Sequence, residues 1–105
     1  GLSDCNLTYI NKQVLRQMKD LSHLNLDTNQ IKHIPDDTFD CLTNLEEVDL
    51  RQNPLQQIKI NRLFLKCDKL KKVYLNDALT VDLMDERFNF KRTVKIHDNN
   101  NIWNF

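Results

Sequence analysis

The stretch from Leu45 to Leu55 constrains the fold of this chain more than any other, because its pattern returns at a nearly constant interval. It has the form LxxLxLxxNxL, with valine in the second apolar position and Asn53 near the end. The same frame begins upstream at Leu21 and downstream at Leu70, and a partial copy opens the chain. A unit repeated at this interval predicts a solenoid, in which each coil buries its apolar residues against its neighbours. The asparagine position is occupied, in order, by Cys5, Asn29, Asn53 and Ala78.

Each part of this pattern has a physical reason. Side chains alternate along a strand, so Val48 and Leu50 are expected to point inward and Asp49 outward. The chain then leaves the strand, and the asparagine side chain bonds backbone groups in the turn that no strand partner satisfies. We expect Cys5 to be a buried thiol in this position, and the turn at Ala78 to be looser. Four strands are expected, at Leu24–Leu26, Val48–Leu50, Val73–Leu75 and Val94–Ile96.

The second half of each unit agrees with the first. Apolar residues follow the asparagine position at two fixed distances along the chain. The segment from His33 to Leu42 resembles the xIPxxxFxxL half of the typical extracellular subclass of leucine-rich repeats, and the repeats are similar to insect-type or Toll-type ectodomains. This resemblance implies an α/β fold: a leucine-rich repeat solenoid of four to five coils, with a parallel concave β-sheet and short helices or turns on the convex side. The apolar positions are Ile10, Ile34, Ile58 and Leu83, then Leu15, Phe39, Leu63 and Phe88.

The length of 105 residues predicts one domain, residues 1–105. Its coils are expected at about 1–20, 21–44, 45–69 and 70–90, with a terminal coil and degenerate C-terminal cap at 91–105. Short helical segments are expected at Val14–Lys19 and Asn61–Lys69. The tail resembles the opening of a C-terminal flanking cap, although it lacks the proline and the cysteine, and we expect Trp103 and Phe105 to cover the last coil.

Composition argues against several classes of function. Fifteen basic and fifteen acidic residues cancel, so no overall field favours nucleic acid or an anionic membrane. There is no apolar run of the roughly 18 residues that insertion into a bilayer requires. Gly1 is the single glycine, which excludes a glycine-rich phosphate loop. The three histidines lie in different repeats without zinc-ligand spacing, so we expect no metal, no cofactor and no catalysis.

Two features bear on the environment of the protein. Asn6-Leu7-Thr8 is an N-glycosylation sequon, which favours an extracellular protein, either secreted or part of an ectodomain. Cys41 and Cys67 are expected on the convex side of adjacent repeats. Free buried thiols are the favoured interpretation of this pair and a disulfide is the alternative, because a bridge demands a specific geometry.

The outward strand positions are the candidate binding site. They are free from packing in the core and form a rigid platform that suits another protein. Tyr74 and Arg51 belong to residue types that dominate binding hot spots. Charge pairs such as Glu47 with Lys72 and Asp49 with Arg51 would account for about half of the charges on this face, but they leave Tyr74 without a partner. The predicted ligand-binding residues are Asn25, Asp49, Arg51, Lys72, Tyr74 and Lys95.

Two functions remain open at this point. The first is a non-enzymatic recognition module that binds a protein ligand on its concave face, in innate immunity or at the cell surface. The second is a structural or self-associating unit, or a fragment of a larger leucine-rich repeat receptor. The second interpretation rests on the first coil, where Leu2 and Leu7 would lie uncovered and could form a homodimer.

Overall fold

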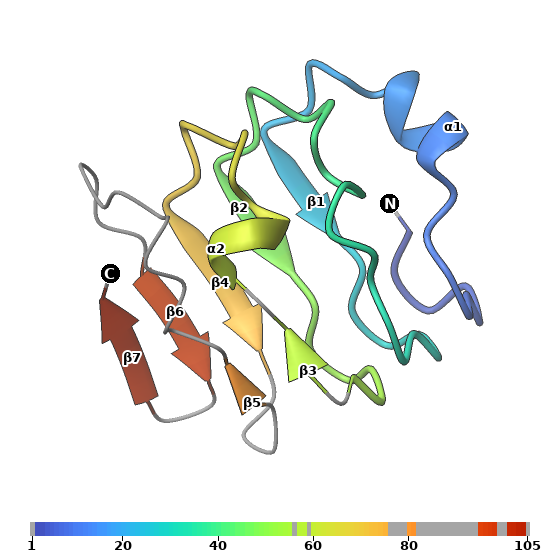
Figure 1. The fold of residues 1–105 in the computed structure, drawn as a ribbon. Coiled ribbons are helices and arrows are strands. Elements are labelled where there is room, and N and C mark those ends of the chain that lie inside the picture. Colours follow the sequence, from blue (N-terminus) through green and yellow to red (C-terminus); the bar gives the residue numbers. More distant parts are fainter. Residues whose placement is uncertain are drawn as a thin grey trace.

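The strands form at the alternating positions of the repeats, and parallel pairing joins one repeat to the next. The computed structural model describes residues 2–55, 57–58, 60–75, 80–81, 95–98 and 101–104. Within these ranges the larger sheet has the strand order β1-β2-β4-β6-β7 (Figure 1). The first four strands are parallel, and β7 pairs with β6 in the antiparallel sense. The strands are β1 (His23–Asn25), β2 (Glu47–Asp49), β4 (Lys72–Leu75), β6 (Lys95–Asp98) and β7 (Asn101–Asn104).

The register of the sheet follows the spacing of the repeats. Leu24 lies opposite Val48, Val48 opposite Val73, and Val73 opposite Ile96. The nearly constant interval between repeats therefore brings equivalent positions together across each pair of strands. The prediction that Asp49 lies beside Tyr74 is confirmed.

The core is a continuous stack of the inward residues. Leu26, Leu50 and Leu75 are fully buried, as are the valines that precede the last two in β2 and β4. On the opposite side of the coils, the rings of Phe39 and Phe64 stack with their centroids 5.4 Å apart. Stacking of coils thus replaces the central core of a globular domain.

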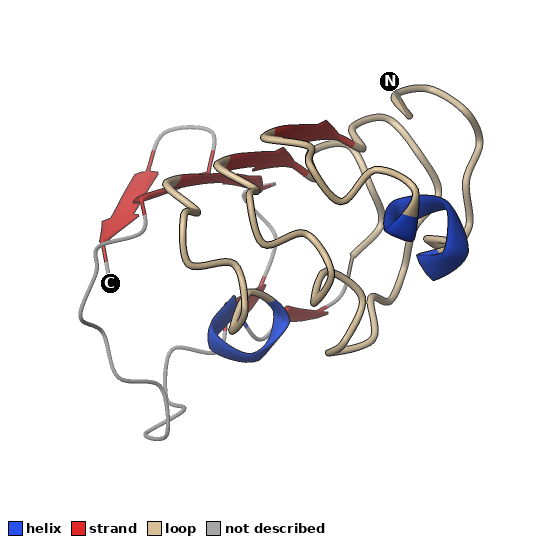
Figure 2. Ribbon diagram, turned by 90° about the horizontal axis from the view of Figure 1, so that it is seen from above, coloured by secondary structure: helices blue, strands red, loops and turns tan. Residues whose placement is uncertain are grey.

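Short helices and a second sheet lie away from the main strands (Figure 2). Helix α1 (Lys12–Arg16) begins before the predicted segment, because Asn11 caps it by accepting a hydrogen bond from the Gln13 N–H at 2.8 Å. Helix α2 (Ile60–Leu63) falls at the start of the second predicted segment. Strands β3 (Gln57–Ile58) and β5 (Thr80–Val81) pair in parallel, which the repeat pattern did not predict.

Two asparagines form the ladder that the pattern predicts. The Asn53 Oδ1 atom accepts from the Ile31 N–H at 3.1 Å, and its Nδ2 donates to the carbonyls of Leu26 and Leu50 at 2.9 and 3.1 Å. Asn29 does the same one coil earlier, where its Oδ1 accepts from the backbone N–H groups of Cys5 and Leu7 at 3.0 Å each. Each side chain therefore joins the turn of its own coil to that of the coil before it.

The first coil differs from the prediction at its cysteine. Cys5 is exposed rather than buried, and its thiol contacts the Ser3 carbonyl at 3.2 Å. The thiol lies at the surface because the described chain places no further coil against this turn. The turn at Ala78 and the predicted cover by Phe105 lie outside the described residues, as do the positions of Leu83 and Phe88. Trp103 lies in β7, in register with Ile96 of β6.

Candidate functional site

The exposed side of β1, β2 and β4 is the surface that the sequence predicts as a binding site. We call it the sheet face. The residues with described side chains alternate as expected, with half-buried or exposed polar residues between buried apolar ones. The sheet face comprises His23, Asn25, Glu47, Asp49, Arg51, Lys72 and Tyr74.

Glu47 links all three strands. Its Oε2 atom lies 2.9 Å from Nε2 of His23 on β1, and its Oε1 accepts a hydrogen bond of 3.2 Å from the Tyr74 hydroxyl on β4. The ionised carboxylate can only accept, so Nε2 of His23 carries the proton in this contact. The Ser22 hydroxyl lies 2.9 Å from Nδ1 on the other side of the ring. The histidine is therefore held from both sides although its side chain is 62% exposed.

Asp49 and Arg51 form a second, adjoining group. The Arg51 side chain donates from Nε to Oδ1 at 3.0 Å and from Nη2 to Oδ2 at 2.7 Å, which is bidentate geometry. The backbone N–H of Arg51 also donates to Asp49 Oδ1 at 3.0 Å. The guanidinium lies over the ring of Tyr74, 5.0 Å from its centroid, and forms a cation–π contact.

The electrostatics of the two groups follow from these contacts. The hydrogen bond to Asp49 raises the pKa of Arg51 above its usual value. Burial, reinforced by the Glu47 carboxylate, raises the pKa of Tyr74 above 10.0, so the neutral phenol is favoured at physiological pH. At the rim of the sheet face the Lys71 ammonium lies 3.0 Å from Glu46 and lowers the pKa of that carboxyl group.

The structure corrects two predictions on the sheet face. Tyr74 was expected to have no partner, but it bonds Glu47 and stacks with Arg51. Glu47 was expected to pair with Lys72, which lies in register with it, but the carboxylate bonds His23 and Tyr74 instead. The predicted pair of Asp49 and Arg51 is confirmed. His23 and Glu47 stand one repeat apart, and this spacing contains the signal for the contact that sequence reasoning missed.

The other two predicted binding residues occupy different positions. Asn25 lies on β1 and its Oδ1 accepts from the Asp27 N–H at 3.1 Å, so it also shapes the turn that follows. Lys95 begins β6, in register with Lys72. The residues Asn25, Asp49, Lys72, Tyr74 and Lys95 thus lie on neighbouring strands, and Arg51 reaches Tyr74 from the turn after β2.

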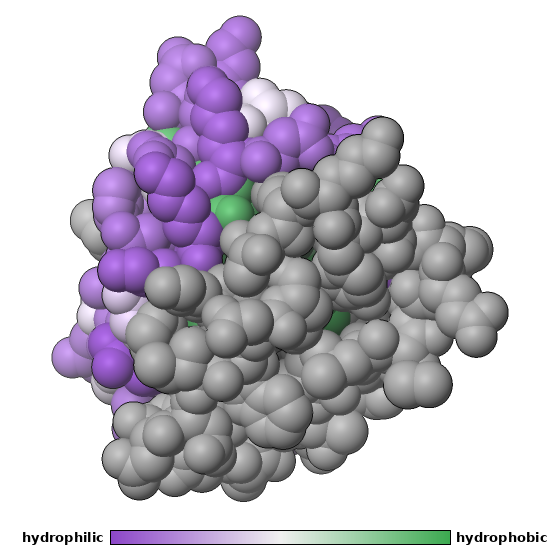
Figure 3. All heavy atoms as spheres, turned by 90° about the vertical axis from the view of Figure 1, so that its left-hand side faces the viewer, coloured by the Kyte–Doolittle hydropathy of each residue, from purple (hydrophilic) through white to green (hydrophobic). Residues whose placement is uncertain are grey.

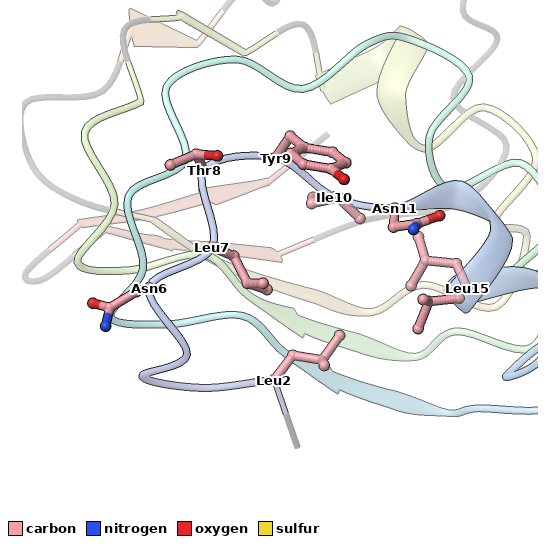
Figure 4. A pocket seen from close by; sticks show the side chains of 9 residues that line it. Leu2, Asn6, Leu7, Thr8, Tyr9, Ile10, Asn11 and Leu15 are labelled. Atoms are coloured by element: carbon pink, nitrogen blue, oxygen red, sulfur yellow. The ribbon is translucent and has the colours of Figure 1, made fainter.

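A second surface lies at the open end of the coils next to β1. It surrounds a cavity of about 360 Å³, toward which Leu2, Leu7 and Ile10 point (Figure 4). We call it the end surface. In contrast, the described residues visible on the side of the molecule shown in Figure 3 are mostly hydrophilic. The residues that line the end surface are Leu2, Asn6, Leu7, Thr8, Tyr9, Ile10, Asn11, Val14 and Leu15.

Among the described residues, the cysteines and the possible metal ligands form neither a disulfide nor a metal cluster. Cys41 is half-buried, and Cys67 is buried with its Sγ 3.5 Å from the Phe39 carbonyl. In the part of the chain that the structure describes, no cluster of histidine, cysteine and carboxylate side chains could hold a metal ion. None of the helices described there is long and apolar enough to cross a membrane.

Comparison with known proteins decides the family. A family model described as leucine rich repeat matches residues 1–55, more than half of the chain. The chain belongs to the leucine-rich repeat family. No curated protein matches it. Leucine-rich repeats generally mediate recognition between proteins, and the family is typically non-enzymatic. The matched region contains β1, β2 and the asparagine ladder, and β4 continues the same register beyond it.

Proposed function

We propose that this leucine-rich repeat protein recognises a protein ligand on its sheet face and the adjoining start of β6, with Asn25, Asp49, Arg51, Lys72, Tyr74 and Lys95 as contact residues. The observation that carries this proposal is the group formed by Tyr74, Arg51 and Glu47. A tyrosine and an arginine stand half-buried or exposed on a sheet and are held in place by their neighbours. Side chains ordered before binding lose less conformational entropy when a partner arrives.

The roles of these residues in binding differ. Tyr74 and Arg51 offer a planar surface with hydrogen-bonding groups, which is typical of a hot spot near the centre of an interface. Glu46 and Lys71 lie at the rim, where charges affect the rate of association more than the affinity. The convex pair of Lys12 and Asp37, 2.9 Å apart, lies away from the sheet face and serves as a control position.

The test is affinity capture from extracellular fluid with three immobilised proteins: wild type, Tyr74→Ala and Lys12→Ala. A ligand of the sheet face is retained by wild type and by Lys12→Ala, and is lost or strongly reduced with Tyr74→Ala. For such a ligand we expect Tyr74→Ala to weaken binding by about 2 kcal/mol or more. Denaturant titration of each variant checks that it is folded. A ligand that binds Tyr74→Ala normally and Lys12→Ala poorly would place the site on the convex side.

We also propose that the protein is extracellular, either secreted or part of an ectodomain, and that it acts in innate immunity or cell-surface recognition. The His33–Leu42 segment supports the typical extracellular subclass, of insect or Toll type, and a solenoid of four to five coils. The sequon at Asn6 supports a secreted glycoprotein, and the structure has Asn6 and Thr8 exposed. Mass spectrometry of the protein from secreting cells tests this proposal, since an unmodified Asn6 would count against it.

The end surface favours a second candidate function, self-association. Leu2, Leu7 and Ile10 are only partly buried, and Val14 is 39% exposed. The edge of β1 is also open among the described residues. Ser22 and Leu26 direct their backbone groups to β2, so those of His23 and Asn25 point to the opposite side. Open strand edges readily pair with another chain.

The occupant we propose for the end surface is a second copy of this chain. Strand β1 has none of the usual protections of an edge, such as lysine, proline or a bulge, and it has no carboxylate that would repel its own copy. Sedimentation of wild type and Leu7→Glu over a range of concentrations tests the proposal. A dimer that the charged side chain dissociates supports it, and a wild-type monomer at high concentration rejects it.

A further inference from the structure

Lys72 is the one basic residue of the sheet face to which the described residues offer no carboxylate. Arg51 has Asp49 at 2.7 Å, and His23 has Glu47 at 2.9 Å. Lys72 lies in register with Glu47, but both oxygens of that carboxylate already bond side chains of β1 and β4. The lysine side chain is half-buried and makes no ion pair within the described part of the chain.

A second lysine occupies the neighbouring position in the sheet. Strand β4 lies between β2 and β6 (Figure 1), and Lys72 is opposite Lys95 in the register of β4 and β6. Strands of one sheet are about 4.8 Å apart, and like charges in directly opposite positions destabilise a sheet. The register therefore gives this pair of positions an excess of positive charge, which an anionic group of a partner would neutralise.

The acidic residues beside these positions select the kind of anion. Glu47 lies opposite Lys72, and Asp49 lies opposite the next outward position of β4. A polyanion such as a nucleic acid or a sulfated polysaccharide would cross these carboxylates and be repelled by them. A single carboxylate on a protein segment avoids this repulsion, because its neighbours along the segment carry no negative charge. The mixed charges of the sheet face thus favour an aspartate or a glutamate of a protein.

The alternation along β4 indicates what accompanies that carboxylate. Lys72 and Tyr74 are two residues apart and alternate with buried residues, so they lie on the same side of the strand. In an extended segment, side chains two positions apart also share a side, at a spacing of about 7 Å. An extended segment that runs along β4 can therefore place one side chain over Lys72 and the next but one over Tyr74. The ring of Tyr74, with the Arg51 guanidinium over it, suits an apolar or aromatic side chain.

We infer that the partner of the sheet face presents an acidic segment. Its aspartate or glutamate lies over Lys72 and Lys95, and an apolar or aromatic residue two positions away lies over Tyr74. This inference rests on the proposed function and adds the chemistry of the partner to it. Because Lys72 is half-buried, its ion pair with the segment is screened by salt less than the pairs at the rim are.

The probe that tests this inference is a library of random peptides displayed on phage, selected on immobilised wild type and on Tyr74→Ala. We expect the peptides that wild type retains and Tyr74→Ala loses to be enriched in acidic residues two positions from an apolar or aromatic one. One such peptide is then synthesised, together with a copy in which the matching amide replaces the carboxylate. The neutral copy should bind wild type at least about fivefold more weakly, a comparison that needs no change in the protein.

Three variants assign the effect to one lysine. Lys72→Gln removes the charge and keeps most of the stem, Lys72→Arg keeps the charge, and Lys12→Gln removes the same charge from the convex side. Lys72→Gln should weaken the acidic peptide at least about fivefold and the neutral copy less than about twofold. Lys72→Arg and Lys12→Gln should bind the acidic peptide as wild type does. Denaturant titration checks that each variant is folded.

The possible failures point to different conclusions. Peptides that need Tyr74 but show no excess of acidic residues overturn this inference and leave the proposed function intact. Equal binding of the acidic and neutral peptides, or an acidic peptide indifferent to Lys72→Gln, does the same. If wild type retains heparin but no acidic peptide, the anion belongs to a sulfated polysaccharide and the inference is wrong. If no peptide depends on Tyr74, an acidic segment is also excluded, and capture from extracellular fluid then decides the proposed function by itself.

Discussion

The first coil and the second coil carry the same apolar pattern but bury it to different extents. Leu7 and Ile31 hold equivalent places just after the asparagine position, yet Ile31 is fully buried and Leu7 only in part. Ile34 is 6% exposed, while its counterpart Ile10 lines an open cavity. The pattern thus determines which side chains point inward, but a neighbouring coil is needed to remove them from water.

The largest expected effect concerns two leucines that hold the same position of the pattern in different coils. Leu50 and Leu2 hold equivalent places just before the asparagine position, and Leu50 is fully buried. Leu50→Ala should lower the free energy of unfolding by about 2–5 kcal/mol, since it leaves a cavity in the stack. Leu2→Ala should cost less than half as much because the side chain is only partly buried. Urea denaturation measures both, and equal losses would mean that the end surface is covered in solution.

Substitutions in the asparagine ladder should change stability by an intermediate amount. Asn53 is 5% exposed and bonds backbone groups in two coils. Asn53→Ala leaves the Ile31 N–H buried without that acceptor. A buried N–H group that loses its acceptor lowers the free energy of unfolding by about 1–3 kcal/mol. Cys5 holds the same position in the first coil but is exposed, so Cys5→Ala should change stability by less than about 0.5 kcal/mol. A large loss with Cys5→Ala would contradict the open end.

Much of the fold could be predicted from the sequence, because the spacing of the repeats sets which residues of neighbouring strands lie opposite one another. The repeat interval alone places Glu47 beside Lys72 and Asp49 beside Tyr74. The burial of Leu26, Phe39 and Leu63 follows from the same frame. These properties depend on the period of the chain, which a sequence displays directly.

The side-chain contacts could not be predicted in the same way. Register places Glu47 next to both His23 and Lys72, and the choice between these partners depends on geometry that spacing does not contain. Tyr74 reaches Glu47 diagonally, beyond its own register partner Asp49. The exposure of Cys5 depends on the absence of a covering coil in the described chain, which the residue's own position in the pattern does not reveal.

The smallest expected effect concerns ionisation of Tyr74. This residue lies on β4, between the neighbouring strands β2 and β6, whereas Tyr9 of the first coil is 66% exposed. Because burial and Glu47 raise the pKa of Tyr74 in the folded protein, unfolded chains lose this proton at lower pH. Tyrosine in the unfolded chain titrates near pH 10. The contribution of Tyr74 to stability is therefore complete below that pH and is lost as the pH rises through the folded-state pKa.

Spectroscopic titration of the phenol tests this prediction. The chain has two tyrosines, so in Tyr9→Phe the ultraviolet change on phenol ionisation comes from Tyr74 alone, since Trp103 absorbs but does not ionise. We expect its titration above 10.0 in the folded protein. In Tyr9→Phe/Glu47→Gln the titration should move to lower pH, because the neutral amide no longer opposes a phenolate through its charge. A titration at the same pH in both proteins would show that the charge of Glu47 does not contribute to the raised pKa of Tyr74. Glu47 would then hold the Tyr74 hydroxyl in place through its hydrogen bond without affecting the ionisation of the phenol.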